Sequence, residues 1–416
     1  MANIVHICPR YFPARGGSEL FFRKLSDASA HGGHSVSVWT TDAATVQAFT
    51  SATGHRLPPG PVTINGVEVR RFPVRYVPAQ RFVRTAAHGL PFGTRWKCDT
   101  LRWTPWVPGL TRAATYPTEK VDLVHAAGLP YSSVLFAGAR LAERAGAQLV
   151  MSPFTHFPPP GPSGARMQRA YLSPLNVRLL ARADRLFVQT ERERRLLTDA
   201  GLSSSRQTIV GLGVDRGECT GGSRERGRRA WKVPDDATVV GHLANKSWDK
   251  GTVDLLDAAE RLWAKGVTFV LVLAGAEMDS FGRRWADVRR SERVVNLGEL
   301  SDEERKDFFA AIDVFALPSY VESFGVTSLE AAVNGAAVVA YDHGGPGEIF
   351  RHENTALLAP VGDIDVLSRM IERLTMGASE RARIAEAGCL LASGYSWQRA
   401  LNTALGEYDA LLAQTT

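Results

Sequence analysis

Glu322 and Glu330 have seven residues between them, where a predicted strand gives way to a predicted helix. Glu322 lies in the loop and Glu330 in the helix, which we expect to begin near Val326. Gly325 directly precedes that helix, and a helix start leaves backbone N–H groups free for a phosphate, which the helix dipole also favours. A carboxylate beside a phosphate site usually accepts hydrogen bonds from sugar hydroxyls, as in dinucleotide-binding folds. The segment therefore predicts a site for a nucleotide that carries a polyhydroxylated group.

A lysine followed by a glycine, Lys250-Gly251, precedes a second predicted helix, Thr252–Leu262. An ammonium there can stabilise the negative charge that builds on a departing diphosphate. Such a pair is common on protein surfaces, so this interpretation depends on the segments around it. His156 follows a predicted strand, Leu149–Phe154, and a lone histidine at a strand end is more often structural than ligand-binding.

The segment from Glu322 to Gly335 resembles the signature of glycosyltransferase family 4, whose members are retaining enzymes of the GT-B fold. The downstream Gly344-Gly345 and Glu348 match the extension of that signature. The resemblance covers nearly the whole chain. Its other matching segments are Tyr11–Glu19, Gly33–Val36, Val124-His125, Thr155-His156, Gly213–Asp215 and Tyr395–Trp397.

The resemblance implies a role for each matching residue. It implies that Glu322 binds sugar hydroxyls, that Lys250 neutralises the diphosphate and that His156 contacts the donor sugar, so these are the candidate catalytic residues. It also implies that Glu330 binds the ribose. The candidate donor-binding residues are Gly16, Gly17, Lys246, Leu297, Gly298, Phe324, Gly325, Val326, Thr327 and Glu330.

The chain departs from the family pattern at one cation. The family usually has an arginine soon after the glycine of the strand, but here Gly241 is followed by His242. We expect Lys246 to replace that arginine, with His242 as the less favoured alternative. For His125, donor contact and a structural role both stay open.

Short β-branched segments alternate with helical patterns along almost the whole chain. This alternation predicts βαβ units and parallel sheets with helices on both faces, in which ligands bind beyond the carboxyl ends of the strands. Helices are predicted around Leu135–Glu143 and Tyr171–Arg182. The predicted strands are Ile4–Ile7, Val36–Trp39, Val121–Val124, Gln148–Val150, Leu186–Val188, Val239–Gly241, Phe269–Leu273, Val294–Leu297, Val314–Leu317 and Val338–Ala340.

The fold class is therefore α/β. The resemblance implies the GT-B architecture of two Rossmann-like, doubly wound domains facing a deep cleft. We expect an acceptor-binding domain over residues 1–207, a nucleotide-sugar-binding domain over 208–393, and a return helix over 394–416 that packs on the first domain.

Three local segments carry further predictions. Residues 216–230, rich in glycine and arginine, are predicted to be a solvated connector without a helix. Residues 73–118, rich in Pro, Arg and Trp, are predicted to be an irregular insertion outside the sheet, either a surface excursion or a flap for the acceptor. Asn65-Gly66 predicts the tight turn of a β-hairpin.

The composition excludes a disordered chain, because 44% of the residues are hydrophobic and the net charge of +6 is small for 416 residues. The longest apolar segment, Val267–Ala274, is far shorter than the roughly 20 residues that span a bilayer. The scattered cysteines predict reduced thiols in a cytoplasmic protein. They are Cys8, Cys98, Cys219 and Cys389.

No metal site and no cofactor are expected, because the nucleotide sugar is a co-substrate. Asp363-Ile-Asp365 has the spacing of a metal motif, but its position at a predicted helix start indicates capping. The expected partners are a nucleotide-sugar donor and a small-molecule or lipid acceptor, with no nucleic acid and at most peripheral membrane contact. A homodimer stays open.

The predicted function is a retaining glycosyltransferase that moves a sugar from a nucleoside-diphosphate sugar to a hydroxyl-bearing or other nucleophilic acceptor, in small-molecule, natural-product or glycolipid biosynthesis. UDP is the first choice of nucleotide and GDP the second. The alternatives are a nucleotide-sugar epimerase or phosphorylase on the same scaffold, or a nucleotide-sugar-binding protein that has lost activity. An epimerase would convert the donor with no acceptor present.

Overall fold

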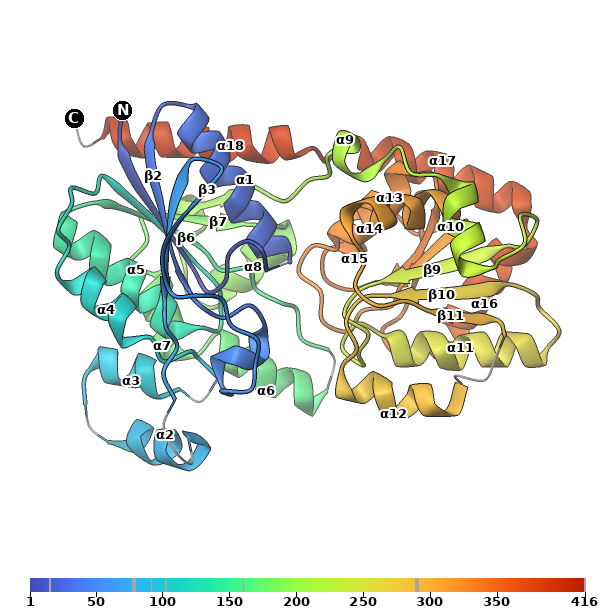
Figure 1. Cartoon of the computed structure of the whole chain (residues 1–416), viewed down its shortest axis with the longest axis horizontal. Coiled ribbons are helices and arrows are strands. Elements are labelled where there is room, and N and C mark those ends of the chain that lie inside the picture. Colours follow the sequence, from blue (N-terminus) through green and yellow to red (C-terminus); the bar gives the residue numbers. More distant parts are fainter. Residues whose placement is uncertain are drawn as a thin grey trace. The chain divides into compact units, whose positions relative to one another are not determined.

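The computed structural model of the chain describes residues 1–14, 16–76, 80–90, 92–101, 103–159, 161–288 and 292–414. It divides into two compact units (Figure 1). Unit 1 comprises residues 1–155, 166–211 and 400–416, and unit 2 comprises residues 156–165 and 212–399. Most of the last helix therefore belongs to unit 1, and a short segment that follows a strand of unit 1 belongs to unit 2.

Unit 1 is built on an eight-stranded sheet with the order β3-β4-β2-β1-β5-β6-β7-β8. All neighbouring strands are parallel except the β3–β4 hairpin at one edge. The strands are β1 (Asn3–Cys8), β2 (Ser35–Thr41), β3 (Gly60–Ile64), β4 (Val67–Phe72), β5 (Leu123–Ala127), β6 (Gln148–Ser152), β7 (Arg185–Val188) and β8 (Gln207–Ile209). The helices are α1 (Gly17–His31), α2 (Gln80–Gly89), α3 (Thr94–Thr100), α4 (Pro108–Thr115), α5 (Ser132–Ala145), α6 (Pro162–Tyr171, which spans the unit boundary), α7 (Pro174–Leu180), α8 (Glu191–Asp199) and α18 (Trp397–Ala413).

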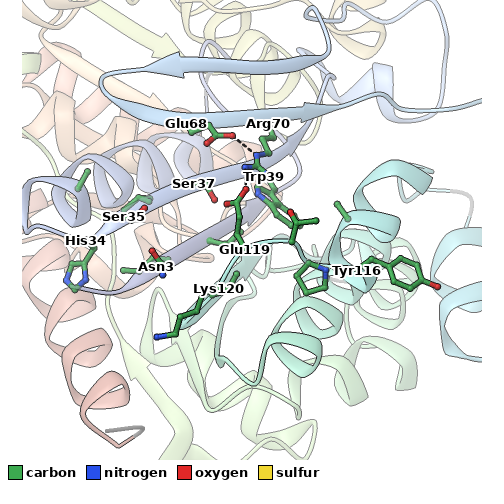
Figure 2. Close-up of a pocket in the computed structure, with 18 of the residues that line it drawn as sticks. Asn3, His34, Ser35, Ser37, Trp39, Glu68, Arg70, Tyr116, Glu119 and Lys120 are labelled. Carbon is green, nitrogen blue, oxygen red and sulfur yellow. Dashed lines mark hydrogen bonds and ion pairs between the residues drawn. The ribbon is translucent and has the colours of Figure 1, made fainter.

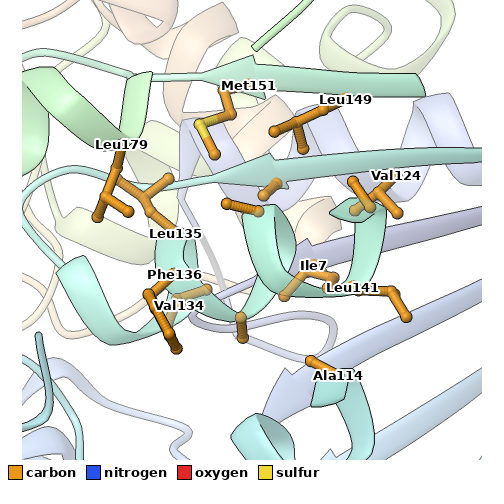
Figure 3. Close-up of a cluster of buried hydrophobic side chains, with 14 of the residues drawn as sticks. Ile7, Ala114, Val124, Val134, Leu135, Phe136, Leu141, Leu149, Met151 and Leu179 are labelled. Carbon is orange, nitrogen blue, oxygen red and sulfur yellow. The ribbon is translucent and has the colours of Figure 1, made fainter. Parts of the chain in front are cut away.

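One face of the first sheet packs against α4, α5 and α7. Alternate residues of each strand enter this core, as strand geometry requires; Val5 and Ile7 of β1 and Val124 of β5 are examples. Figure 3 shows Ile7 and Val124 in this core, together with Leu135, Leu141 and Leu179 of the covering helices. The residues between them point to the opposite face.

Unit 2 has a six-stranded parallel sheet with the order β11-β10-β9-β12-β13-β14. This is the doubly wound order that reverses direction between its first and fourth strands. The strands are β9 (Val239–Leu243), β10 (Val270–Ala274), β11 (Val294–Asn296), β12 (Val314–Leu317), β13 (Ala337–Tyr341) and β14 (Leu357–Ala359). The helices are α9 (Arg216–Cys219), α10 (Arg224–Trp231), α11 (Thr252–Ala264), α12 (Asp279–Val288), α13 (Asp302–Ala311), α14 (Val326–Val333), α15 (Pro346–Ile349), α16 (Ile364–Met376) and α17 (Ala378–Ala392).

Both faces of the second sheet are covered, as Figure 1 shows. A core on one face joins α11, α12 and α16 to the sheet, and a core on the other joins α13 and α14. The strands are buried on both faces, which explains why they are nearly continuous apolar runs. The point where the strand order reverses lies between β9 and β12, and ligands in such sheets bind beyond the carboxyl ends of the strands at this point.

The α/β class and all ten predicted strands are confirmed, with ends that differ by at most three residues. The Asn65-Gly66 turn is also confirmed, since both residues have positive φ and join two antiparallel strands. Asp363 caps α16 by accepting a hydrogen bond from the Val366 N–H, as expected.

One local prediction was wrong, and two were right only in part. Residues 216–230 form α9 and α10 rather than a helix-free connector, because Asp215 and Ser223 cap the two helices and Arg228 is buried on Asp313 at 2.9 Å. The described part of residues 73–118 lies outside the sheet, as predicted, but it forms three helices and is not irregular. The helix predicted around Tyr171–Arg182 is present as the shorter α7, which begins at Pro174 with Ser173 as its cap, while α6 ends at Tyr171.

Two histidines are buried on the face of the first sheet opposite the apolar core. His6 contacts Ser26 Oγ at 2.7 Å and Tyr408 Oη at 3.1 Å, and His125 contacts the same Tyr408 Oη at 2.5 Å and Ser152 Oγ at 2.8 Å. Tyr408 lies on α18, so this network fastens the C-terminal helix to β1 and β5. Burial lowers the pKa of His6 to about 3, and burial together with the neighbouring His6 lowers the pKa of His125.

We expect the free energy of unfolding to fall as the pH drops below about 6.5. Below that pH the histidine is protonated in the unfolded chain, whereas in the folded protein His6 stays neutral until about pH 3. Each such histidine contributes a slope of at most about 1.4 kcal/mol per pH unit. Urea unfolding between pH 7.5 and 5 measures this slope. His6→Gln should make it shallower, and His31→Gln, at an exposed position, should not. Equal slopes for wild type and His6→Gln would contradict the prediction.

Candidate functional site

An ion pair joins the two loops that leave the second sheet at its switch point. Lys250 follows β9 and Glu322 follows β12, and these strands are parallel neighbours. The Lys250 Nζ donates to Glu322 Oε2 at 2.9 Å and to the Val321 carbonyl at 2.9 Å. The structure therefore brings together two candidate catalytic residues from segments about 70 residues apart in the sequence.

The Glu322 carboxylate is held on both oxygens. Its Oε1 accepts the N–H groups of Ser323 at 3.1 Å and Gly325 at 3.2 Å. Burial by itself raises the pKa of Glu322, but the charge and hydrogen bond of Lys250, the charge of His156 and the Ser323 amide outweigh it and lower the pKa. Glu322 is therefore an ionised acceptor at neutral pH, suited to sugar hydroxyls and not to donating a proton.

Glycines allow the loops of this site to approach each other closely. A Cβ on Gly251 would lie 1.8 Å from the Pro318 carbonyl oxygen, and φ there is +69°. Gly325, the residue before α14, has φ +83° and lies against the Pro346 ring, 2.7 Å from where its Cβ would be. Both positions combine a left-handed backbone with a close contact, so any other residue would displace a loop.

The Gly344-Gly345 segment packs backbone to backbone on the loop of Glu322. A Cβ on Gly344 would lie 2.2 Å from the Glu322 carbonyl oxygen, and one on Gly345 would lie 2.2 Å from the Phe324 carbonyl oxygen. The matching glycines of the sequence pattern thus stand where two loops have no room for a side chain. They set the position of Glu322 and of the start of α14.

His156 belongs to unit 2, although it follows a strand of unit 1 in the chain. Its charge acts on Glu322, and the carbonyl of the next residue, Phe157, accepts a hydrogen bond from His343 Nε2 at 3.2 Å. His343 directly precedes Gly344. All three candidate catalytic residues, Glu322, Lys250 and His156, therefore lie around the same pair of loops.

Glu330 lies further along α14 and is buried against Arg305 of α13. Arg305 Nη2 donates to Glu330 Oε2. Burial raises the pKa of Glu330, the nearby Glu218 adds to this rise, and Arg305 opposes it without cancelling it. Sequence reasoning missed Arg305, because it sits among other charged residues at the start of α13 and no local motif marks it.

The two residues expected to replace the missing arginine are both engaged by protein groups. His242 is buried, with Nδ1 donating to the Ala316 carbonyl at 2.8 Å and Nε2 contacting Thr252 Oγ1 at 2.9 Å. Burial is the main cause that lowers its pKa to about 4, so it carries no charge at neutral pH. The geometry therefore gives His242 a structural role at the base of α11.

Lys246 is likewise buried, and its ammonium holds three strand ends together. It donates to Asn296 Oδ1 and to the Leu297 carbonyl, both at 2.5 Å, and lies 3.4 Å from Glu277 Oε1. Burial lowers the pKa of Lys246 although Glu277 opposes the shift. These contacts favour a structural role for Lys246, with Lys250 as the cation of the site.

The remaining candidates lie at strand ends or helix starts. Leu297 and Gly298 follow β11, and the Gly298 carbonyl accepts the Gly275 N–H at 2.9 Å. Phe324 is buried beside Gly325. Val326 and Thr327 begin α14, where N–H groups have no earlier helical carbonyl to bond.

Gly16 and Gly17 precede and begin α1 in unit 1, and Arg15 of the same motif lies outside the described residues. A Cβ on Gly16 would lie 2.3 Å from Glu19 Oε2, so the glycine permits close approach of that carboxylate to the loop. His125, for which a donor contact was left open, lies in the buried network with Tyr408. The geometry gives His125 a structural role.

A pocket of about 780 Å³ lies at the amino-terminal ends of β1 and β2, and none of the candidate residues lines it. Figure 2 shows Glu119 and Glu68 pointing toward Arg70 on its wall. Arg70 pairs with Glu68 at 2.5 Å and with Glu119 at 2.6 Å, so these charges already satisfy one another. The pocket therefore lies where the strands of the first sheet begin, and the loops that follow these strands lie at their other ends.

Two further features bear on the site. In the described part of the chain, no three His, Cys, Asp or Glu side chains gather into a group that could hold a metal ion. Across the same residues, each helix is too short or too polar to cross a membrane.

Several solved structures share this architecture. A sucrose-phosphate synthase from Thermosynechococcus elongatus superposes with a TM-score of 0.77 over 100% of both chains, at 19% identity. HepE of Anabaena, solved with UDP and glucose, has a TM-score of 0.73 and 20% identity over 99% of this chain and 100% of that one. At these identities the likeness shows the fold, which is the GT-B fold.

Curated relatives include D-inositol 3-phosphate glycosyltransferases. That of Mycolicibacterium smegmatis is 32% identical over 56% of this chain, a stretch that spans only about half of the relative's length (54%). That of Thermobifida fusca is 29% identical over 88% of this chain and 84% of its own.

Family models match both halves of the chain. The model for a glycosyl transferase 4-like domain matches residues 16–213, and the model for glycosyl transferases group 1 matches residues 223–389. The second match contains Lys250, Glu322 and Glu330. Together with the fold and the site, these matches show that the chain belongs to the glycosyltransferases of family 4.

Proposed function

We propose that this protein is a retaining glycosyltransferase that uses a nucleoside-diphosphate sugar as its donor. The observation that carries the proposal is the Lys250–Glu322 pair beside the start of α14, at the switch point of the second sheet. A fixed cation, an ionised acceptor and free helix amides stand together there. This is the combination that a diphosphate with a sugar attached requires.

Each group acts on a different part of the donor. The amides of Val326 and Thr327 bind the distal phosphate, Glu322 accepts hydrogen bonds from sugar hydroxyls, and Glu330 binds the ribose. Lys250 neutralises charge on the diphosphate as it departs. Because Lys250 is already held by Glu322 and the Val321 carbonyl, little reorganisation is needed when that charge develops.

Transfer proceeds with retention in this proposal. The bond between the anomeric carbon and the diphosphate oxygen breaks, and the acceptor oxygen bonds to the same face of the sugar. The proton of the acceptor hydroxyl passes to the departing diphosphate. Catalysis then comes from positioning and from leaving-group stabilisation, so Glu322 need not act as a nucleophile or base.

UDP is the first choice of nucleotide, and GDP the second. This choice is supported by HepE, solved with UDP-glucose, and by the Escherichia coli trehalose-6-phosphate protein, solved with UDP-2-fluoro glucose. The named activity of the curated relatives supports a hydroxyl-bearing acceptor, either a small molecule or a lipid. The four free cysteines support a reducing, cytoplasmic location.

Lys250→Ala should lower turnover by about 10²–10³-fold, the effect of removing one preorganised electrostatic group. Affinity for the intact donor should fall less, because the extra charge appears only in the transition state. UDP release from UDP-glucose by slow hydrolysis, with calorimetry for binding, measures both quantities. Lys265→Ala, which removes an exposed lysine at the other end of α11, is the matched control. If the turnover of Lys250→Ala stays within about threefold of wild type, the diphosphate does not bind beside Lys250.

Glu330→Ala should weaken free UDP binding by about 10- to 100-fold, since a hydrogen bond to a charged group contributes roughly 1.5–3 kcal/mol. Glu322→Ala should leave free UDP binding unchanged and weaken UDP-glucose binding, because its partners are sugar hydroxyls. Calorimetry with both ligands on both variants separates the two roles. Equal losses for UDP and UDP-glucose in Glu322→Ala would refute this division.

We also propose that transfer needs no metal ion, because the Lys250 cation stands where a metal would otherwise neutralise the diphosphate. Activity measured in excess EDTA should therefore equal that in untreated enzyme. Loss of activity in EDTA that Mn²⁺ or Mg²⁺ restores would overturn this part of the proposal.

A further inference from the structure

A second pocket, of about 700 Å³, lies within the segment 84–108 of unit 1. Figure 1 shows α2 and α3 as a pair of short helices at the edge of unit 1, and α3 packs on α5 and α7. The side chains that shape the pocket are Arg84, Phe92, Arg95, Trp96, Asp99 and Trp106. None of them is a candidate residue of the donor site.

The wall of this pocket is aromatic and partly open to solvent. Phe92 is 54% exposed and Trp96 is 38% exposed, and their rings meet edge to face at 5.0 Å. Trp96 Nε1 donates to the Ala87 carbonyl at 2.6 Å, which fixes the indole ring and leaves its apolar surface toward the pocket. An aromatic wall of this kind suits a ligand with an apolar body.

One charged side chain of the pocket has unused donors. Arg84 is only 5% exposed, and its Nη2 donates to the Asp99 and Thr104 carbonyls, both at 2.8 Å. Its Nε and Nη1 are buried, and neither has a hydrogen-bond partner among the described residues. Leaving buried donors of a charged group unpaired is costly, so a ligand that accepts from them gains that energy on binding.

The net charge of the lining favours an anion. Arg84 and Arg95 are positive and Asp99 is the single carboxylate among the lining residues. Asp99 Oδ2 lies 3.7 Å from Arg95 Nε, so Arg95 is the cation that faces this carboxylate most directly. The Arg84 guanidinium donates a hydrogen bond to the Asp99 backbone carbonyl and feels the charge of the Asp99 carboxylate, so the two arginines leave one positive charge in excess for an incoming anion.

We propose that this pocket binds an amphipathic anion, with an alkyl or aromatic body against Phe92 and Trp96 and a carboxylate or phosphate on Arg84. Each of the two unused nitrogens, Nε and Nη1, can donate a charge-assisted hydrogen bond to such an oxyanion. The pocket shares no lining residue with the donor site, and the inference does not rest on the proposed glycosyl transfer, because binding is measured without donor.

Calorimetry and tryptophan fluorescence on the full chain, with octyl phosphate, octanoate and neutral octanol below their micelle concentrations, test the proposal. At least one anion should bind at one site per chain, about tenfold or more tighter than octanol, the effect expected of a charge-assisted hydrogen bond. The ratio between octyl phosphate and octanoate then tells a phosphate-bearing ligand from a carboxylate-bearing one.

Two variants locate the binding site. Arg84→Met should remove the preference for anions, so that octyl phosphate and octanoate bind no tighter than octanol, and Arg84→Lys should restore part of it. Because Arg84 is buried, a second variant at an exposed position is needed, and Phe92→Ser at the rim of the pocket should leave the fold intact. It should lower the affinity for every probe about fivefold, because apolar contact is lost. Tyr116→Ser, at an exposed aromatic outside this pocket, is the matched control and should bind like wild type.

Three results would overturn the proposal. The first is that octanol binds as tightly as the anions. The second is that Phe92→Ser binds every probe like wild type. The third is that no probe binds the wild-type chain at millimolar concentration.

Discussion

The salt bridge between Lys250 and Glu322 holds together the two loops on which the proposed chemistry depends. It is partly buried, so removing one partner would leave the other charge without compensation in a site of low dielectric. The salt bridge also orients the ammonium of Lys250 and the carboxylate of Glu322 for their proposed contacts with the donor. Lys250 is held near the helix start, and Glu322 stays ionised with both oxygens directed by fixed donors.

This salt bridge is possible only because backbones approach each other without side chains between them. Gly251 lets the lysine loop pass over the Pro318 carbonyl, and Gly344 and Gly345 let a third loop lie directly on residues 322–324. Because these loops pack closely, the positions of the strand ends determine where the charged groups lie. A rigid sheet thus places the site, although every functional side chain is on a loop or at a helix end.

In unit 1, a polar network performs the corresponding structural task. The hydroxyl of Tyr408 meets both His6 and His125, so the last helix is tied to the two central strands on either side of that unit's own switch point. Buried polar groups of this kind stabilise a unique arrangement only while every partner is neutral and paired. The pocket of Arg84 differs, because its guanidinium has nitrogens for which the described residues supply no partner.

The sequence by itself determined the features that depend on near neighbours. Strand and helix alternation, the turn at Asn65-Gly66, the cap at Asp363 and the glycine before α14 each rest on interactions within a few residues, and the structure agrees with them. The same locality explains the errors. Residues 216–230 looked unfit for a helix because the carboxylates that pair with their arginines, such as Asp313, are supplied from far along the chain.

Only the tertiary structure decided which charged groups meet. It paired Glu330 with Arg305 and engaged Lys246 with Asn296 and the Leu297 carbonyl. It also enclosed His125 in a network with α18. The physical reason is that the order of strands in the sheet, and not the distance in sequence, determines which loops lie side by side. A buried charged side chain therefore pairs with a group from the loop that the strand order places next to it.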